Sequence, residues 1–307
     1  MSFGEIIGQE RAISILKNAK TAEKISHAYI FAGPIGVGKK RVALEFAKWL
    51  NCMELETSGP CDSCRSCKKV NNLQHPEIRV YEEEKANISI QKVREIQRDI
   101  QYKRTESKYR VVIIDEAEKL TLEAANCFLK ALEEPPEGTI IILVTSSISG
   151  MLKTIISRCQ IIRFKNLSFD EKIAILKNLT DYSLEHIREA FFVCGENISE
   201  TELFLNSSEK DEIKRFIEIK THLDKREFSS NLQREFEILA KDKVEFARFL
   251  NFLINKKEIN CRNNNELINE DIQFLLKVKT YLNRNVNPRL LWAWIYLNES
   301  QGYNYKF

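Results

Sequence analysis

The sequence contains few residues that break helices, little net charge and no long hydrophobic run. Only 10 glycines and 6 prolines occur in 307 residues, which indicates a mostly helical protein with few turns. The formal charge of +3, from 47 basic and 44 acidic residues, favours neither nucleic acid nor a membrane surface as a direct partner. Because the chain shows no charged-then-apolar leader and no run of membrane-spanning length, we expect a soluble cytoplasmic protein. Its 307 residues are enough for two or three domains.

The stretch with the clearest chemical content is Gly33-Pro-Ile-Gly-Val-Gly-Lys39-Lys40. An apolar run suited to a buried parallel strand, 28–32, precedes it, and a segment with helical apolar spacing, 41–50, follows it. Glycines let backbone N–H groups turn inward, the helix adds its positive N-terminal end, and a lysine supplies charge for the outer phosphates. The stretch predicts a phosphate-binding loop for ATP or ADP, with a glycine-rich turn that binds no phosphate as the alternative. The residues expected in this site are Gly33, Gly36, Gly38, Lys39 and Lys40.

The residue after the loop lysine departs from the usual phosphate-loop pattern. A serine or threonine normally stands there, because its hydroxyl is a ligand of the magnesium ion that bridges the outer phosphates. Lys40 has no lone pair with which to bind a metal. The site is therefore expected to keep the shape of a nucleotide site and to have lost hydrolysis, while nucleotide binding itself stays open.

Two carboxylates follow a second segment that is typical of a buried strand. Four consecutive β-branched residues, 111–114, precede Asp115 and Glu116. Open α/β sheets bind ligands at the carboxyl ends of their strands, and in a working hydrolase Asp115 would orient magnesium while Glu116 polarised the attacking water. The alternative is that both acidic residues cap the next segment on a solvated face.

Four of the eight cysteines form a metal-ligand pattern. Cys61, Cys64 and Cys67 follow one another with two residues between them, and Cys52 lies just upstream, at the end of the predicted helix. Four thiolates close a tetrahedral site around zinc and leave no open position, so we expect a structural Zn²⁺, with an iron–sulfur cluster as the alternative. This knuckle is an insertion and does not belong to the sheet.

Strand and helix patterns alternate as far as Phe164 and only helical patterns follow. The strands 28–32, 75–81, 111–114, 139–145 and 160–164 alternate with helices, one of them capped by Ser89, which predicts a parallel, doubly wound α/β sheet. The expected division is a sheet domain, 1–165, with the cysteine module 52–67; a helical lid, 166–207; and an all-α domain, 208–307, in which one helix covers 244–255.

These residues together resemble the clamp-loader subunits of bacterial DNA polymerase III. The resemblance covers the phosphate loop, the four cysteines, His75-Pro76, Asp115 to Glu118, Leu129-Lys-Ala-Leu-Glu-Glu-Pro-Pro136 and Ser157-Arg158-Cys159. It implies an AAA+ P-loop domain with a zinc knuckle, a helical lid and a helical collar through which subunits form a ring. It also implies gamma/tau and delta subunits as partners, with the sliding clamp and primed DNA reached through the complex and no membrane contact.

Within this family the sequence is more similar to the delta-prime branch than to the gamma/tau motors. Motor subunits keep Lys-Thr or Lys-Ser in the loop, where this sequence has Lys39-Lys40, and they carry a nucleotide-sensing arginine where this sequence has 195–199, without arginine. The resemblance implies a largely non-hydrolysing subunit whose Arg158 acts as an arginine finger at the ATP site of a neighbouring motor. For Ser-Arg-Cys alone, an ordinary surface ion pair is the alternative.

Two other functions stay open at this point. An active gamma/tau-like ATPase would use Asp115 alone to hold the metal and would tolerate Lys40. A zinc-stabilised AAA-like module acting on nucleic acid outside replication would bind DNA by itself, with an affinity that falls steeply as salt rises.

Overall fold

The computed structural model describes residues 3–54, 59–82, 87–194, 197–206, 210–224, 230–263 and 270–301. Its contacts divide the chain into two compact units, Met1–Glu171 and Lys172–Phe307. The further division of the second unit into a lid and a collar at 207/208 stays a prediction, and that boundary lies outside the described residues. Of the segment 195–199, the first two residues also lie outside them.

A five-stranded parallel sheet forms the centre of the first unit, in the order β2-β3-β4-β1-β5. Strand β1, which lies between β4 and β5, is wholly buried, as the apolar run predicts, and pairs with β4 from Ala28↔Ile141 to Ala32↔Thr145. The predicted parallel α/β sheet is confirmed. The strands are β1 Ala28–Ala32, β2 Ile78–Tyr81, β3 Arg110–Ile114, β4 Thr139–Thr145 and β5 Gln160–Arg163.

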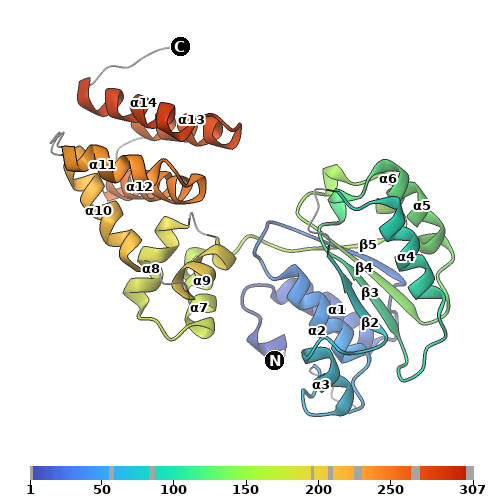
Figure 1. Cartoon of the computed structure of the whole chain (residues 1–307). Helices are drawn as coiled ribbons and strands as arrows, with labels where there is room; N and C mark the ends of the chain where they lie inside the picture. Colours follow the sequence, from blue (N-terminus) through green and yellow to red (C-terminus); the bar gives the residue numbers. More distant parts are fainter. Residues whose placement is uncertain are drawn as a thin grey trace. The chain divides into compact units, whose positions relative to one another are not determined.

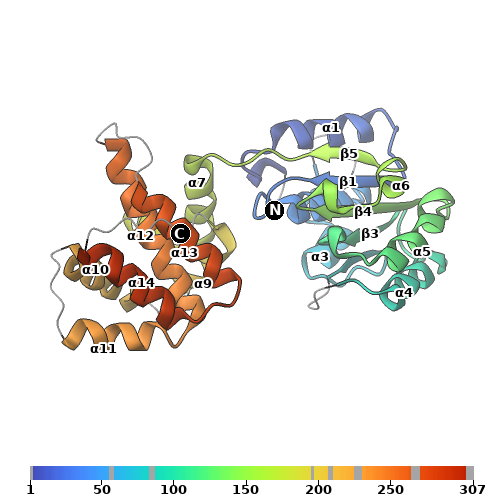
Figure 2. The same ribbon diagram turned by 90° about the horizontal axis from the view of Figure 1, so that it is seen from above.

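Helices cover both faces of this sheet, so the first unit has three layers (Figures 1 and 2). On one face, α4, α5 and α6 pack their apolar residues against alternate side chains of the strands, among them Ile30, Val112 and Ile141. On the other face lie α1 and α2, where the rings of Phe46 and Tyr29 meet edge to face. The helices are α1 Glu10–Thr21, α2 Lys39–Leu50, α3 Arg65–Asn71, α4 Ile90–Gln101, α5 Leu122–Glu133 and α6 Lys153–Ile156, with 3₁₀ turns η1 Phe3–Glu5, η2 Ala117–Lys119 and η3 Ile148–Gly150.

Side-chain caps define where two of these helices begin. The Ser89 hydroxyl accepts the backbone N–H of Lys92 at the start of α4, and the Thr121 hydroxyl accepts that of Ala124 at the start of α5. The predicted cap at Ser89 is confirmed. Since α5 ends at Glu133, just before two prolines, its length is set from both sides by the sequence.

The secondary-structure elements in the described part of the second unit are all helices. Phe216, Phe249 and Trp292 are buried in it, and the Trp292 ring stacks on that of Phe236. Each helix in the described part of the chain is too short or too polar to cross a membrane. The helices are α7 Phe169–Leu179, which spans the division between the units, α8 Leu184–Val193, α9 Ile198–Asn206, α10 Lys210–Asp224, α11 Ser230–Leu239, α12 Lys243–Asn263, α13 Glu270–Asn283 and α14 Pro288–Gln301.

One predicted helix end in this unit is wrong. The helix expected to stop at Asn255 continues to Asn263 as α12. The eight residues that follow Asn255 contain neither glycine nor proline, so nothing breaks the backbone there. Lys257, in this part of α12, forms an ion pair with Asp271 on α13, with 2.9 Å between the ammonium and the carboxylate.

Candidate functional site

The phosphate loop joins the end of β1 to the start of α2, as predicted. Gly38 is the residue before the helix and has φ 87°, and Gly36 has φ 78°, conformations that side chains other than glycine rarely adopt. A Cβ atom at Gly33 would lie 2.6 Å from the carbonyl oxygen of Phe164, so this position has no room for a side chain. The three glycines therefore shape the loop and its contact with the chain just after β5.

The Lys39 side chain is folded into its own loop. Its ammonium donates to the carbonyl oxygens of Gly33, at 2.7 Å, and Pro34, at 2.5 Å. Burial lowers the pKa of Lys39, while the nearby carboxylates of Asp115 and Glu118 act in the opposite direction. A phosphate group in the loop would favour the charged form further, which is the role predicted for this lysine.

Lys40 does not point away from the loop into solvent. Its Nζ atom lies 2.5 Å from a carboxylate oxygen of Glu82 and 3.7 Å from one of Asp115. These two acidic residues follow the neighbouring strands β2 and β3, which pair at Tyr81↔Ile114. The structure thus brings together Lys40 and Asp115, two of the predicted site residues, at the carboxyl edge of the sheet.

The other acidic residues after β3 have different partners. Glu116 adopts φ 50°, and its exposed carboxylate lies 2.6 Å from the Lys119 ammonium. Glu118 reaches the end of β4, where it accepts the backbone N–H of Ser146 at 2.9 Å and also the Ser146 hydroxyl. Burial would raise the pKa of Glu118, but its hydrogen bonds, chiefly those from Ser146, outweigh this effect, and the pKa is lowered. Burial raises the pKa of Asp115, with the Lys40 ammonium opposing that rise. Glu118, not Glu116, is therefore the carboxylate that links β3 to β4.

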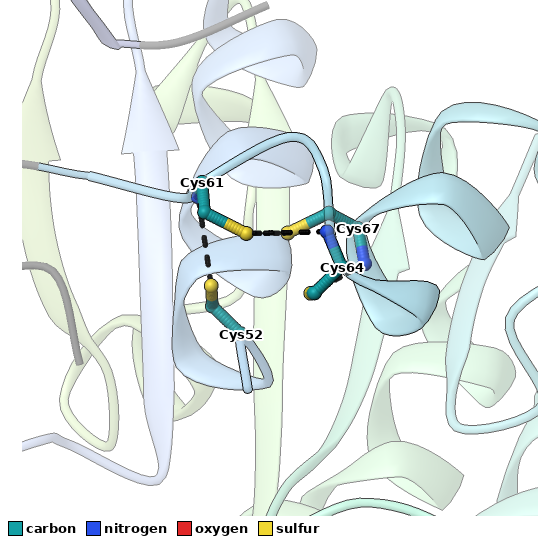
Figure 3. A group of neighbouring side chains, drawn as sticks. All are labelled: Cys52, Cys61, Cys64 and Cys67. Atoms are coloured by element: carbon teal, nitrogen blue, oxygen red, sulfur yellow. Dashed lines mark hydrogen bonds between the residues drawn. The ribbon is translucent and has the colours of Figure 1, made fainter. Parts of the chain in front are cut away.

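The four predicted cysteine ligands form one cluster, with all four sulfur atoms within 4.8 Å of one another. Figure 3 shows the side chains turned toward a common centre. Cys52 comes from the chain after α2, Cys61 and Cys64 from the turn that leads into α3, and Cys67 from α3 itself. The sulfur atoms of Cys61 and Cys67 are 3.9 Å apart. In a tetrahedral zinc site with bonds of about 2.3 Å, two sulfur atoms are separated by about 3.8 Å, so the cluster has the dimensions of such a site.

Backbone N–H groups around the cluster point at the sulfur atoms. Those of Cys64 and Cys67 lie 3.3 and 3.4 Å from the sulfurs of Cys61 and Cys64, an arrangement that stabilises thiolates. Hydrogen bonding from Ser63 lowers the pKa of the Cys61 thiol to about 6, whereas burial raises the pKa values of Cys52 and Cys67. Four sulfur donors suit zinc, and bound Zn²⁺ would hold the 52–67 module together without offering an open position for chemistry.

Arg158, the predicted finger, lies on the turn between α6 and β5. Its guanidinium donates to one carboxylate oxygen of Glu133 at 2.9 and 2.5 Å and to the carbonyl oxygen of Thr154 at 2.9 Å. The side chain remains 35 % exposed. The arrangement holds a cationic group at the surface of the unit in one orientation.

Three residues near these sites were not predicted as site residues. Glu82 and Glu133 are the carboxylates that hold Lys40 and Arg158, and Gln9 is buried where its amide donates to the carbonyl oxygens of Lys165, at 2.9 Å, and of Val37 in the loop. Glu82 directly follows a predicted strand, the same signal that identified Asp115, so this pattern was available in the sequence. The partners of Glu133 and Gln9 are distant in the sequence and gave no such signal.

Comparison with known proteins identifies relatives for this arrangement. A family model described as DNA polymerase III, delta subunit, matches residues 8–168. The chain is 36 % identical over 159 residues to the DNA polymerase III subunit delta' of Bacillus subtilis, an alignment that covers 52 % of this chain and 48 % of the relative. It is 35 % identical over 187 residues to subunit tau of the same organism, covering 61 % of this chain and 33 % of tau.

A solved structure supports the same fold over most of the chain. A DNA polymerase III gamma subunit-related protein from Thermotoga maritima covers 94 % of this chain and 99 % of its own, with a TM-score of 0.58 at 18 % identity. The Bacillus subtilis relatives are matched over less than half of their own lengths. Since the family model matches more than half of the chain, this protein belongs to the family described as DNA polymerase III, delta subunit, whose members are AAA+ clamp-loader subunits related to gamma, tau and delta-prime.

Proposed function

We propose that this protein is a delta-prime-like subunit of a DNA polymerase III clamp loader that does not hydrolyse ATP by itself. It would join gamma/tau and delta subunits in a hetero-oligomeric ring and, through the complex, act on the sliding clamp and primed DNA in the cytoplasm. The observation that supports this role is Lys40, whose ammonium is paired with Glu82 and Asp115 where a motor subunit has a hydroxyl ligand of magnesium. A subunit with this substitution lacks one direct ligand of the catalytic metal.

The proposed contribution of the subunit to catalysis is Arg158, acting at a neighbour's ATP site. A guanidinium stabilises the charge that develops on the transferred phosphoryl group, and it works in trans whether or not its own subunit binds nucleotide. The partly exposed position of Arg158 and its hydrogen bonds to Glu133 support this role. The cysteine cluster would bind one structural zinc ion beside α2.

ATP turnover by the purified protein, alone and mixed with the motor and delta subunits of the same organism, tests the proposal. We expect no turnover alone and stimulated turnover in the mixture. An arginine finger raises kcat about 10³- to 10⁵-fold, so Arg158→Ala should nearly abolish hydrolysis at the one ATP site to which Arg158 contributes. Arg94→Ala, which removes an exposed arginine on α4, is the matched control and should leave the mixture unchanged.

The second candidate is an active gamma/tau-like ATPase. It is favoured by the identity to tau, which is nearly equal to the identity to delta', and by the presence of Asp115 at the end of β3. Turnover by the protein alone that disappears in Lys39→Ala would establish this candidate and reject the first. Turnover of the mixture that is unchanged by Arg158→Ala would reject the finger.

A further inference from the structure

The site holds a cation of its own where this fold normally recruits magnesium. Lys40 follows Lys39 in the first turn of α2, and its ammonium lies 2.5 Å from Glu82 and 3.7 Å from Asp115. In a working P-loop site the carboxylate after this strand and the hydroxyl after the loop lysine hold the metal between them. Here the same two positions form an ion pair with each other.

This arrangement does not fit a magnesium ion. Mg²⁺ requires near-octahedral oxygen ligands, and Lys40 replaces one such ligand with a group that has hydrogens and no lone pair. The positive charge beside Asp115 also repels a divalent cation approaching that carboxylate. The chain therefore supplies a fixed single charge where related sites use an exchangeable double charge.

The rest of the loop keeps the features that hold phosphate. Cβ atoms built on Gly36 and Gly38 would meet nothing within 4 Å, so the space in front of these backbone groups is open. The Lys39 ammonium lies inside the loop, within 2.7 Å of two backbone carbonyl oxygens that a phosphate oxygen can replace. The Glu82 side chain is 57 % exposed, so its carboxylate can turn into water and leave the Lys40 ammonium facing an outer phosphate.

We propose that Lys40 replaces the magnesium ion in this site, so that the polyphosphate of a nucleotide binds here without a divalent cation and magnesium does not strengthen the binding. This inference goes beyond the proposed function and is independent of Arg158. The loop would serve as a metal-free polyphosphate site, and its occupancy would not respond to magnesium as that of a motor subunit does.

Calorimetric titration of the full-length protein with ATP, in EDTA and again in excess MgCl₂, tests this inference. The wild-type protein should bind ATP in EDTA, with the same or lower affinity in magnesium. Lys40→Thr should bind about tenfold more weakly in EDTA, the effect of losing one charge-assisted contact, and should regain affinity in magnesium. Lys24→Thr, which changes an exposed lysine outside the loop, should behave like the wild type.

Two further variants keep the result interpretable. Lys39→Ala should abolish binding in both buffers, which assigns the ATP to this loop. Lys40→Met keeps most of the length of the side chain without its charge, so it should lose affinity in EDTA and gain none from magnesium. Wild-type affinity raised tenfold or more by magnesium would overturn the inference, and so would the absence of ATP binding in both buffers. Either result would leave the finger role of Arg158 intact.

Discussion

We predict that Lys48→Met destabilises both the helix after the phosphate loop and the cysteine module, because the Lys48 side chain connects them. The Lys48 side chain is 1 % exposed, and its ammonium lies 2.9 Å from Glu45, 2.5 Å from Asp62 and 3.0 Å from the Asn71 side-chain oxygen. These partners belong to α2, to the turn between two of the cysteines and to α3. Lys48→Met removes the cation and leaves the carboxylates behind.

The expected cost follows from how deeply each carboxylate is buried. The Glu45 side chain is 8 % exposed, and its second oxygen has no hydrogen-bond partner among the described residues. Burial raises the pKa of Glu45, and the Lys48 hydrogen bond only partly offsets that rise. Removing one member of such a buried pair costs about 3–5 kcal/mol. Asp62 is 26 % exposed and can be hydrated, so it adds little to this cost.

A double mutant separates the charge effect from loss of packing. Lys48→Met with Glu45→Gln removes both buried charges and so leaves no unpaired carboxylate at Glu45, and most of the stability lost in the single mutant should return. Urea unfolding followed by circular dichroism measures the stability, and zinc release to a chelating dye, followed in the same titration, reports the cysteine module. Zinc release should move to lower urea together with the unfolding of α2.

Two results would refute this reasoning. One is a cost below about 1 kcal/mol for Lys48→Met, the value typical of a surface ion pair. The other is a double mutant no more stable than the single mutant, because the cost would then come from packing and not from the unpaired Glu45.

Three further predictions concern the other parts of the first unit. Cys64→Ser should release the zinc, because three thiolates leave the tetrahedral site open, whereas Cys127→Ser on α5 should retain it; atomic absorption after gel filtration measures the metal. Glu133→Gln should lower kcat of the mixed clamp loader by less than Arg158→Ala does and leave KM unchanged. The substitution weakens the hydrogen bonds that orient the Arg158 guanidinium but keeps the guanidinium itself. Steady-state ATPase assays measure both constants. Burial lowers the pKa of His75 below the value of about 6.5 expected in the unfolded chain. As the pH falls below about 6.5, the unfolded state therefore takes up a proton before the folded state does. The free energy of unfolding should thus be highest above this pH and decrease below it.

The last of these predictions is checked by the melting temperature between pH 7.5 and 5.5, in the wild type and in His75→Gln. The difference between the two proteins should shrink as the pH falls, and a constant difference would contradict the argument. For the zinc prediction, metal retained by Cys64→Ser would mean that this thiol is not a ligand. For Glu133, an effect equal to that of Arg158→Ala would mean that the pair acts as one unit.

Much of the first unit could be predicted because its signals are local. β1 and β4 have the bounds that their β-branched and aromatic runs predict, and the phosphate loop and cysteine cluster are set by short spacings in the sequence. The contacts that decide what the site does are not local. Lys40 and Glu82 come from different elements that are distant in the sequence, and the pairing of β2 with β3 places Glu82 near Asp115. Arg158 meets Glu133 across the end of α5.

The same limit explains the wrong helix end in the second unit. The residues after Asn255 are mostly polar, so their hydrophobic pattern fades before the helix does. In this part of α12, Lys257 contacts Asp271, whose position on α13 no local pattern gives. The predicted functions of Arg158 and of the loop depend in the same way on partners outside this chain.

The position of β1 in the sheet has a consequence for synthesis of the protein. β1 leaves the ribosome before the other four strands of this sheet, yet both of its neighbours, β4 and β5, come from much later in the chain. Until residues 33–138 have been made, a strand of five buried residues has no backbone partner and exposes its apolar side chains. Pairing of this kind is intrinsically slow. The nascent chain should therefore need protection by a chaperone during most of the translation of its first unit.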